Sequence, residues 1–351
     1  MSNTLKIVIP TAGWATRVRP QTWSKPKPLV GVAGRTTLDY LLDTFHSVPD
    51  LSTGASQRPE TTEYIIILGP YLGETQIPAY MKENYPGYHV HYVLQSEMRG
   101  QSDALWLARE YLIGPMIMCF ADTLMETDFS FLVNEKSDGV AWVKEVPDPR
   151  RFGVVEVDKD GWISRLIEKP TSLDNKQVVV GCYYFREGRE LVSAIEEQMN
   201  RKDSLNGEYF IADAINIMVE RGSKMRTQAI DIWLDVGTIE TILETNRYLL
   251  GHGHDNTGNI HRENVKIVPP VFIHESAEID HSTIGPNASI GADCNISNST
   301  VEDSILEIGV KVDAAALKSS FIGRQAQVQG RSAESAAMVM NIGDNSSVII
   351  E

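Results

Sequence analysis

Short apolar runs alternate with helical patterns through the first two-thirds of the chain. The runs are rich in aliphatic and β-branched residues, as in strands buried on both faces, and lie at 6–9, 64–68, 90–94 and 116–120. Between them, Leu38, Leu41, Leu42 and Phe45 have helical spacing after a threonine N-cap at 36 or 37, and 104–112 repeats the pattern. This alternation predicts an α/β fold with a mixed, mostly parallel, Rossmann-like sheet flanked by helices. Ligands of such sheets bind at the carboxyl ends of the strands.

The middle of the chain is richer in strands. Strands are expected at 140–146, 154–157, 163–168, 178–185 and 228–234. Helices are expected at 190–199, 211–220 and 239–250. Residues 49–62, rich in Ser, Thr, Gln and Pro, predict a mobile excursion between two elements.

A repeat begins after a polar, glycine-rich linker at 251–259. The linker histidines fit a solvated hinge better than a metal site, since they lack cysteine or carboxylate partners at ligand spacing. Beyond the linker, aliphatic residues recur about every sixth position, and the spacings 267–284, 284–301 and 305–322 are all 17. This period is typical of a β-helix built from hexapeptide repeats. We therefore expect an α/β catalytic domain at 1–250, a linker at 251–265 and a left-handed β-helix domain at 266–351.

Composition narrows the class of protein. With 351 residues, 42% hydrophobic and 23% charged, the chain resembles soluble globular proteins, and no apolar run is long enough to span a bilayer. Three widely spaced cysteines without a CxxC motif fit a reducing compartment, so we expect a cytoplasmic protein without a membrane partner. The net charge of −15 argues against nucleic-acid binding.

The opening segment is basic in this acidic chain. Residues 1–36 hold six basic side chains and no carboxylate, which fits either a local anion site or a solvated face. The connection after the first strand is long, at about 10–36, and such loops are usually functional. Its small residues let backbone N–H groups approach a triphosphate that Arg17 and Lys27 neutralise. It is not a Walker A loop, because no Gly-Lys-Ser/Thr opens the helix.

The motifs of this loop resemble those of the nucleotide-sugar pyrophosphorylases, which are sugar-1-phosphate nucleotidyltransferases. That family opens with G-x-G-T-R, then P-x-T and P-K, and the chain has Gly13, Thr16, Arg17, Pro20, Thr22, Pro26 and Lys27. Ala15 departs from the motif, where the family has glycine. Later segments follow in family order. Gln95 with 100–104 resembles the base-reading segment, 120–122 the metal motif, and 152–155, 168–170 and 180–183 the sugar-phosphate pocket. Residues 207–213 resemble the family's G-E-x-x-x-x-D segment, and 233–238 its W-x-D-x-G-T segment. The resemblance spans about 5–250, and the β-helix matches the family's longer members.

The resemblance implies roles for these residues. Arg17 and Lys27 are the catalytic candidates, and the implied nucleotide-binding residues are Ala12, Gly13, Trp14, Ala15, Thr16, Gln95 and Gly100. The implied sugar-phosphate residues are Gly153, Glu168, Lys169, Val180 and Tyr183. Asp122 and Asp235 are candidate Mg²⁺ ligands, because carboxylate oxygens suit that cofactor. Taken singly, each has a structural alternative: the aspartates could cap helices, Glu168-Lys169 could be a surface pair, and Tyr183 could be a core residue.

The implied reaction makes a nucleotide-sugar and pyrophosphate from a nucleoside triphosphate and a sugar 1-phosphate. The ending 341–348 resembles long-form glucose-1-phosphate thymidylyltransferases, which favours dTTP with glucose 1-phosphate. Asn206 before Gly207 is closer to uridylyltransferases, so UTP with glucose or N-acetylglucosamine 1-phosphate is a rival, and GTP with mannose 1-phosphate a third. A catalytically silent regulatory subunit is the alternative class. We expect a homo-oligomer, and the β-helix fits a scaffold for oligomer contacts or domain docking better than an acyltransferase using His274 or His281.

Overall fold

A computed structural model describes residues 4–51, 53–55, 62–259, 263–332, 334 and 336–350. The chain forms two compact units: Met1–Trp14 with Leu41–Trp233, and Ala15–Tyr40 with Leu234–Glu351. Their boundary passes through the long loop after the first strand, so the opening segment is grouped with the C-terminal repeat. The domain boundaries expected at 250 and 266 stay a prediction. Of the expected excursion at 49–62, residues 52 and 56–61 lie outside the described residues.

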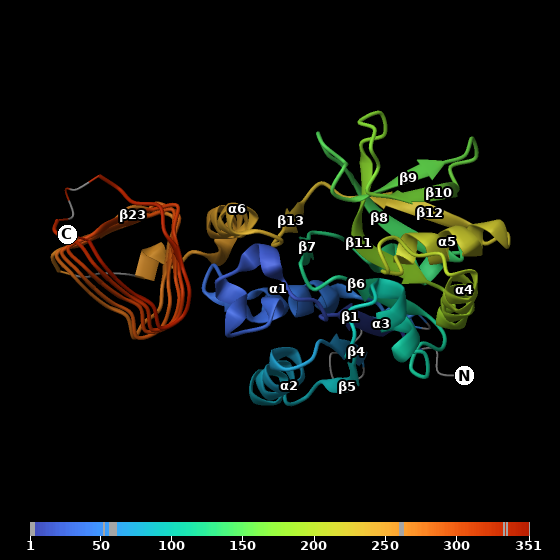
Figure 1. Ribbon diagram of the computed structural model, residues 1–351, viewed down its shortest axis with the longest axis horizontal. Coiled ribbons are helices and arrows are strands. Elements are labelled where there is room, and N and C mark those ends of the chain that lie inside the picture. Colours follow the sequence, from blue (N-terminus) through green and yellow to red (C-terminus); the bar gives the residue numbers. More distant parts are fainter. Residues whose placement is uncertain are drawn as a thin grey trace. The chain divides into compact units, whose positions relative to one another are not determined.

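The first unit is built on a nine-stranded mixed sheet (Figure 1). Its strands are β1 (Lys6–Pro10), β4 (Glu63–Leu68), β5 (His89–Leu94), β6 (Met116–Cys119), β8 (Gly139–Glu145), β9 (Gly153–Val157), β10 (Ile163–Glu168), β11 (Gln177–Phe185) and β12 (Met225–Ala229). The path runs β10-β9-β11-β6-β1-β4-β5, and off this path β8 pairs with β11 and β12 pairs with β8. Strands β6, β1, β4 and β5 are parallel, whereas β9, β10 and β11 pair antiparallel. The predicted mixed, mostly parallel α/β sheet is confirmed.

Two strand expectations were wrong. We expected β5 to be buried on both faces, but it pairs only with β4 at the edge of the sheet, and its residues are exposed or half-buried. The expected strand at 228–234 is divided between β12 and a separate β13 (Trp233–Asp235), because the chain leaves the sheet after Ala229. A short β7 (Thr123–Met125) follows β6.

The helices follow the predicted amphipathic patterns, except that the helix predicted at 104–112 begins at Gln101 and ends at Leu107, and that one helix was not predicted. They are α1 (Thr37–Thr44), α2 (Leu72–Asn84), α3 (Gln101–Leu107), α4 (Gly188–Arg201), α5 (Ile211–Glu220) and α6 (Ile239–Leu249). Thr36 is the N-cap of α1, since its Oγ1 accepts the Asp39 N–H at 3.2 Å. Helix α2 was not predicted, because Pro78 lies inside it and its apolar side chains form no clear stripe.

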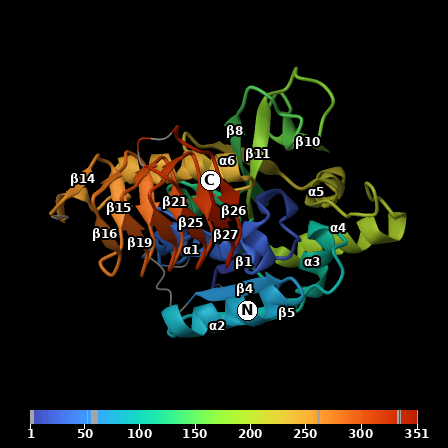
Figure 2. The same cartoon turned by 60° about the vertical axis from the view of Figure 1, so that its left-hand side comes forward.

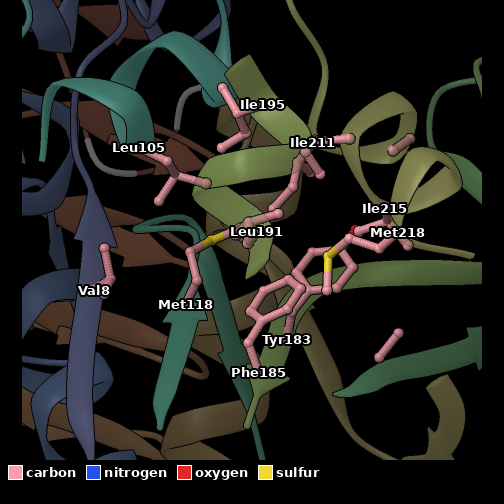
Figure 3. Close-up of a cluster of buried hydrophobic side chains, with 14 of the residues drawn as sticks. Val8, Leu105, Met118, Tyr183, Phe185, Leu191, Ile195, Ile211, Ile215 and Met218 are labelled. Atoms are coloured by element: carbon pink, nitrogen blue, oxygen red, sulfur yellow. The ribbon is translucent and has the colours of Figure 1, made fainter. Parts of the chain in front are cut away.

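A hydrophobic core joins α3, α4 and α5 to one face of the sheet (Figure 3). Leu105, Leu191 and Ile215 from the three helices pack with Met118 and Phe185 from the strands, all of them fully buried. At about 25 cal/mol per Å² of apolar surface, each such side chain contributes roughly 1.5–3 kcal/mol. This core fixes the strands whose carboxyl ends carry the predicted site.

The second unit contains a parallel β-helix (Figure 2). Its strands are β14 (Val265–Ile267), β15 (Val271–Ile273), β16 (Glu278–Asp280), β17 (Ser282–Ile284), β18 (Ala288–Ile290), β19 (Asn295–Ser297), β20 (Thr300–Glu302), β21 (Ile305–Leu306), β22 (Lys311–Asp313), β23 (Ala316–Lys318), β24 (Phe321–Ile322), β25 (Gln327–Gln329), β26 (Asn341–Ile342) and β27 (Ser347–Ile349). Up to β25 every third strand joins the same sheet, and β26 and β27 then extend the sheets of β24 and β25, giving three parallel sheets around an aliphatic interior. The predicted hexapeptide β-helix is confirmed, and these sheets are consistent with the expected left-handed form. A small hairpin, β2 (Gly31–Val32) with β3 (Arg35–Thr36), belongs to the same unit.

The coil length changes along this β-helix. Ile267 pairs with Ile284, and Ile284 with Val301, so the predicted 17-residue spacing holds for the first coils. The spacing 305–322 is not one layer, because Ile305 pairs with Phe321 and the coil there has 16 residues. The next coil of this sheet is longer, because Phe321 pairs with Asn341.

The predicted linker starts as a distorted π-helical turn, Leu250–His254, after α6. Its histidines pack on aromatic rings: His252 stacks on Tyr248 at 3.9 Å between ring centroids, and His254 meets Tyr40 edge-on at 5.0 Å. Within the described parts of the chain, no helix has the length and apolar character needed to cross a membrane.

Candidate active site

Several predicted nucleotide-binding residues of the first unit, and one predicted metal ligand, follow the carboxyl ends of parallel strands. Ala12 and Gly13 follow β1, Gln95 follows β5, and Asp122 comes shortly after β6. The loops are joined at this edge, because Thr11 donates from its N–H and its Oγ1 to the Ile67 carbonyl, both at 2.8 Å. The sheet therefore brings these segments to the edge where α/β folds bind ligands.

The conformation of the opening loop accounts for its departure from the family motif. Ala15 has φ 44° and ψ 41°, a left-handed conformation that glycine adopts without strain. An alanine there costs about 1–2 kcal/mol, so the loop keeps the glycine-type path at a modest energetic cost. Ala15 and Thr16 belong to the second unit, and Gly13 and Trp14 to the first.

An exposed aromatic pair stands at the same edge of the first unit. Trp14 and Tyr71, 54% and 70% exposed, place their ring centroids 6.5 Å apart. Tyr71 comes shortly after β4 and has φ 64°, which is unusual for a bulky residue. Tyr71 was not among the predicted site residues, since nothing in its local sequence pairs it with Trp14.

Gln95 braces the turn that leads into α3. Its side chain is buried, and its Nε2 donates to the Gly100 carbonyl at 3.0 Å and to Asp103 Oδ2 at 2.9 Å. Arg99 extends this network by donating to Asp103 Oδ1 at 2.5 Å. The predicted base-reading pair, Gln95 and Gly100, is thus brought together, and its contact with a base stays a prediction.

Two motifs that are far apart in sequence meet at Gly100. Tyr209 donates its N–H to the Arg99 carbonyl at 2.8 Å and accepts from the Ser102 N–H at 3.0 Å. Gly100 has φ 96°, and a Cβ at this position would lie 2.5 Å from the Tyr209 carbonyl oxygen. The base-reading segment and the segment 207–213 therefore form one structure, and only glycine fits between them.

Replacement of Gly100 by alanine is expected to destabilise the first unit by about 2 kcal/mol or more. The methyl group would push the Tyr209 backbone away and strain the positive φ. Gly161→Ala is a matched control, because Gly161 has φ +85° and nothing within 4 Å of the added methyl, so only about 1 kcal/mol of strain is expected. Urea unfolding of both variants measures the difference, and equal destabilisation would contradict the close approach to Tyr209.

Part of the predicted sugar-phosphate motif lies against the predicted metal segment. Phe120 donates its N–H to the Gly181 carbonyl at 3.0 Å, and Thr123 Oγ1 donates to the Val180 carbonyl at 2.7 Å. A Cβ at Gly181 would lie 2.3 Å from the Phe120 ring. These bonds flank Asp122 on both sides and fix its backbone next to β11. The contribution of Val180 to this contact is its main-chain carbonyl, since its side chain is buried.

Gly153, Glu168 and Lys169 come together at paired ends of β9 and β10. Gly153 and Glu168 are register partners, and Glu168 Oε2 lies 3.2 Å from the position of a Cβ on Gly153. Lys169 has φ 47° and donates its N–H to the Phe152 carbonyl at 2.9 Å. Its Nζ lies 4.6 Å from the centre of the Phe210 ring, a cation–π contact. A cation and a carboxylate thus face one small region, as sugar-phosphate binding requires.

Burial raises the pKa of the Glu168 carboxyl, and nearby Asp213 and Glu208 raise it further, while Lys169 opposes the shift. Burial, with a smaller effect of Asp203, raises the pKa of Asp213 to about 6. Lys169, Asp213 and Glu208 therefore all act on the Glu168 carboxylate, and Phe210 packs on the Lys169 ammonium group. Glu208, Phe210 and Asp213 were missing from the predicted site residues, although their motif at 207–213 was recognised.

Replacement of Asp213 by asparagine is expected to change the pH dependence of stability. The carboxyl has a pKa of 3.8 when unperturbed and about 6 in the folded protein, so between these values the folded state keeps a proton that the unfolded state has lost. Wild-type stability therefore falls as pH rises through this window. The thermal midpoint of Asp213→Asn relative to wild type should rise from pH 4 to pH 6 and stay level above about pH 7. A pH-independent difference would contradict the raised pKa.

Tyr183 is a core residue with a polar end near the sugar-phosphate region. It is 1% exposed, and its ring stacks on Phe185 at 6.2 Å (Figure 3). Burial raises the pKa of its hydroxyl, and the Glu168 carboxylate raises it further. Any contact of Tyr183 with a ligand stays a prediction.

The second unit holds the two predicted catalytic cations. Arg17 lies exposed in a short 3₁₀ helix, Thr16–Val18, and Lys27 is half-buried at the start of another, Lys27–Leu29. Thr37 fixes the second helix by donating from Oγ1 to the Pro28 carbonyl at 2.9 Å. Both cations are therefore held on short, hydrogen-bonded turns rather than on an extended loop.

Asp235 also belongs to the second unit, next to the start of α6. A Cβ on Gly237 would lie 2.8 Å from Asp235 Oδ1, so glycine leaves space for this carboxylate. Thr238 caps α6 by accepting the Thr241 N–H at 3.3 Å. Thr238 thus supplies the cap, and Asp235 is not needed for it. The W-x-D-x-G-T pattern therefore places the Asp235 carboxylate directly before a helix that Thr238 caps.

Comparisons with known proteins agree with this architecture. Residues 6–251 match the nucleotidyl transferase family. A glucose-1-phosphate thymidylyltransferase from Streptomyces antibioticus is 29% identical over 99% of this chain and 100% of its own length. The bifunctional protein GlmU from Methanocaldococcus jannaschii is 30% identical over 77% of this chain and 60% of its own length. A structure of UDP-glucose pyrophosphorylase with UDP-glucose is 18% identical and superposes with a TM-score of 0.57, covering 71% of this chain and 99% of that one.

The chain belongs to the nucleotidyl transferase family, whose match covers most of its length. It is an enzyme of the sugar-1-phosphate nucleotidyltransferase class, as the sequence motifs predict. The solved structure shares its fold with 71% of the chain. The Streptomyces antibioticus relative also matches the C-terminal repeat region.

Proposed function

We propose that this enzyme forms dTDP-glucose and pyrophosphate from dTTP and glucose 1-phosphate. The proposal rests on how much of each sequence the alignments with thymidylyltransferases cover. The two Streptomyces thymidylyltransferases match 99% and 97% of the chain and 100% and 98% of their own lengths, including the repeat region. The GlmU relative matches 60% of its own length. The ending 341–348, which resembles long-form thymidylyltransferases, supports the same substrates.

The chemistry needs positioning and charge neutralisation. An anionic phosphate oxygen of glucose 1-phosphate attacks the α-phosphorus of dTTP in line and forms the new O–P bond. The bond from the α-phosphorus to the bridging oxygen breaks, and pyrophosphate leaves with its electron pair. In this proposal Arg17 stabilises the α-phosphate and the leaving group, and Lys27 holds the triphosphate. Lys169 binds the sugar phosphate, and Glu168 accepts hydrogen bonds from sugar hydroxyls.

The donor set fits Mg²⁺. Asp122 and Asp235 offer hard carboxylate oxygens, and the described residues contain no group of three or more His, Cys, Asp or Glu side chains that could hold a metal. Mg²⁺ is typically bound by one or two carboxylates together with substrate phosphates rather than in an all-protein cage. We propose that these two aspartates hold Mg²⁺, which supplies charge neutralisation on the triphosphate.

The main sequence argument for UTP has a structural explanation. Asn206 and Gly207 have φ 55° and 83°, and Leu205 and Glu208 exchange two backbone hydrogen bonds of 3.0 Å around them. Two positive φ angles define a type I′ turn, for which Asn-Gly is the preferred pair. The turn therefore accounts for Asn206 whichever base the enzyme uses. UTP with glucose or N-acetylglucosamine 1-phosphate, and GTP with mannose 1-phosphate, remain the rivals in the assay.

The test is a matrix of four nucleoside triphosphates and several sugar 1-phosphates, with pyrophosphate release as the readout. We expect the highest kcat/KM for dTTP with glucose 1-phosphate. A higher value for UTP would overturn the choice of base, and release from no pair would overturn the enzymatic proposal. Calorimetric binding of a triphosphate without turnover would instead support a regulatory subunit.

We also propose that the reaction takes place in the cytoplasm. The three cysteines, Cys119, Cys182 and Cys294, are buried free thiols, which fits a reducing compartment. Both expected substrates are metabolites made inside the cell. The protein is purified without a reducing agent, denatured, and then labelled with a thiol reagent that counts its free thiols. Fewer than three free thiols would contradict this assignment.

A further inference from the structure

Lys25 is a completely buried lysine in the opening segment, two residues before Lys27. Its Nζ pairs with Glu307 Oε2 and lies 3.3 Å from Asp344 Oδ1, and both carboxylates belong to the β-helix part of the second unit. The three side chains are 0%, 5% and 8% exposed. Burying one charge requires opposite charges and hydrogen bonds around it, and the β-helix supplies them here.

Arg324 completes this cluster. Its Nε lies 3.7 Å from Glu307 Oε2, and its backbone N–H donates to Asp344 Oδ1 at 2.8 Å. Two cations and two carboxylates are therefore gathered at one place, with no net charge. None of these four side chains is needed for the proposed transfer.

Neutral hydrogen bonds attach the rest of the segment to the same coils. The buried Gln21 donates from Nε2 to the Ile342 carbonyl at 2.8 Å. Ser24 Oγ donates to Asp344 Oδ2 at 2.6 Å. The side chains of the Gln21–Lys25 stretch thus bond to both main-chain and side-chain groups of the β-helix.

One hydrogen bond and the short intervening chain connect this anchored stretch with the two catalytic candidates. Thr22, next to Gln21, donates from Oγ1 to the Ala15 carbonyl at 2.9 Å, and Ala15 leads directly into the turn that carries Arg17. On the other side, Lys27 begins the 3₁₀ turn one residue beyond Pro26, and its carbonyl accepts the Val30 N–H at 3.0 Å. A shift of the anchored stretch would therefore move both cations.

We infer that the β-helix positions the phosphate-binding loop, with Lys25, Glu307 and Asp344 as the positioning residues. The cluster holds the segment in the conformation from which Arg17 and Lys27 meet the triphosphate. This inference rests on the proposed function of those two cations. It assigns the β-helix a role in catalysis, beyond that of a scaffold for subunit contacts.

The test compares full-length Lys25→Met with a matched control. Misplacing a catalytic group by about 1 Å can cost 10²-fold, so we expect kcat to fall about 10²-fold while KM for the triphosphate changes much less. Arg247→Met is the control, because Arg247 donates to Asp303 Oδ2 at 2.8 Å and joins α6 to the β-helix. It should lower the thermal midpoint to a similar degree while kcat stays within about twofold of wild type. Retained kcat in Lys25→Met, or a kcat loss in both variants that follows the thermal midpoint, would overturn the inference.

Two further variants keep the test decisive. Glu307→Gln removes one charge and retains an oxygen that can accept the Gly31 N–H, which lies 3.3 Å from Glu307 Oε1. We expect it to fold and to lose about tenfold in kcat, and unchanged kcat would overturn the inference even if Lys25→Met is insoluble. Lys25→Arg keeps the cation and should recover part of the kcat lost in Lys25→Met.

Hydrogen–deuterium exchange separates this inference from the proposed function. Residues 15–40 should exchange faster in Lys25→Met than in Arg247→Met, whatever reaction the protein catalyses. Equal exchange in the two variants would contradict the anchoring. A wild-type enzyme that releases no pyrophosphate would contradict the proposed function and leave the exchange result to decide the anchoring alone.

Discussion

Replacement of Arg17 by alanine is expected to lower kcat about 10³-fold, the largest single effect of any variant considered. Arginines that meet the charge developing on a transferred phosphoryl group contribute about 10³-fold or more. Arg17 is exposed on its 3₁₀ turn, so the substitution leaves the fold intact. Steady-state pyrophosphate release measures the loss, and KM for glucose 1-phosphate should change little.

Arg19→Ala provides the matched control for this variant. Arg19 is exposed in the same segment, two residues after Arg17. Its main-chain carbonyl accepts a hydrogen bond from Asn341, and this bond does not depend on the Arg19 side chain. Its removal should leave kcat within about twofold of wild type. Similar losses in both variants would mean that the segment attracts anions through its total charge, and that Arg17 has no specific role.

Asp122→Asn and Asp235→Asn are each expected to lower kcat/KM about 10²-fold. A bound metal ion contributes several kcal/mol of charge stabilisation, and a loss of about 3 kcal/mol corresponds to about 10²-fold. Both variants should also need more Mg²⁺ for half-maximal activity, because each loses an anionic ligand. Initial rates over a range of Mg²⁺ concentrations measure both effects.

Asp128→Asn is the control for these carboxylates. Asp128 is an exposed residue after β7 that accepts the Ser130 N–H at 2.8 Å, and it has no place in the proposed site. Its Mg²⁺ dependence should match that of wild type. If Asp122→Asn and Asp235→Asn also keep the wild-type Mg²⁺ dependence, the two aspartates are not the metal ligands.

Local pattern was sufficient for most elements of the fold. Strand β10 and helix α5 begin and end at the predicted residues, because a buried face imposes period 2 or 3.6 on the sequence. The pattern was insufficient for α2, which contains Pro78, and for β5, whose edge position depends on strand order. The break between β12 and β13 was also missed, since the apolar residues continue across it.

The site was predictable as a set of motifs and not as a set of contacts. Each motif was recognised by its own residues, but the contact of Gly100 with Tyr209 joins positions 109 residues apart in the chain. The predicted set of charged residues around Glu168 was incomplete for the same reason, because Asp213 comes from a different element. Such contacts depend on the tertiary fold, which local spacing does not encode.

The basic opening segment shows a second limit of sequence patterns. Its six cations suggested an anion site, but two of them serve elsewhere in the structure. Lys25 pairs with carboxylates of the β-helix, and Lys6 donates from Nζ to the Ile113 carbonyl at 2.7 Å. Charge counts do not distinguish buried partners from ligands. Arg17 and Lys27 therefore carry a larger share of the proposed triphosphate binding than the count implied.

The central claim is that the opening-segment cations and the metal-holding carboxylates act on one phosphoryl transfer. A double-mutant cycle on kcat/KM with Arg17→Ala and Asp235→Asn tests it most directly. Groups that stabilise the same transition state are strongly non-additive, so the double variant should lose little more than Arg17→Ala alone. If the two losses multiply instead, the two side chains act independently, and the claim is contradicted.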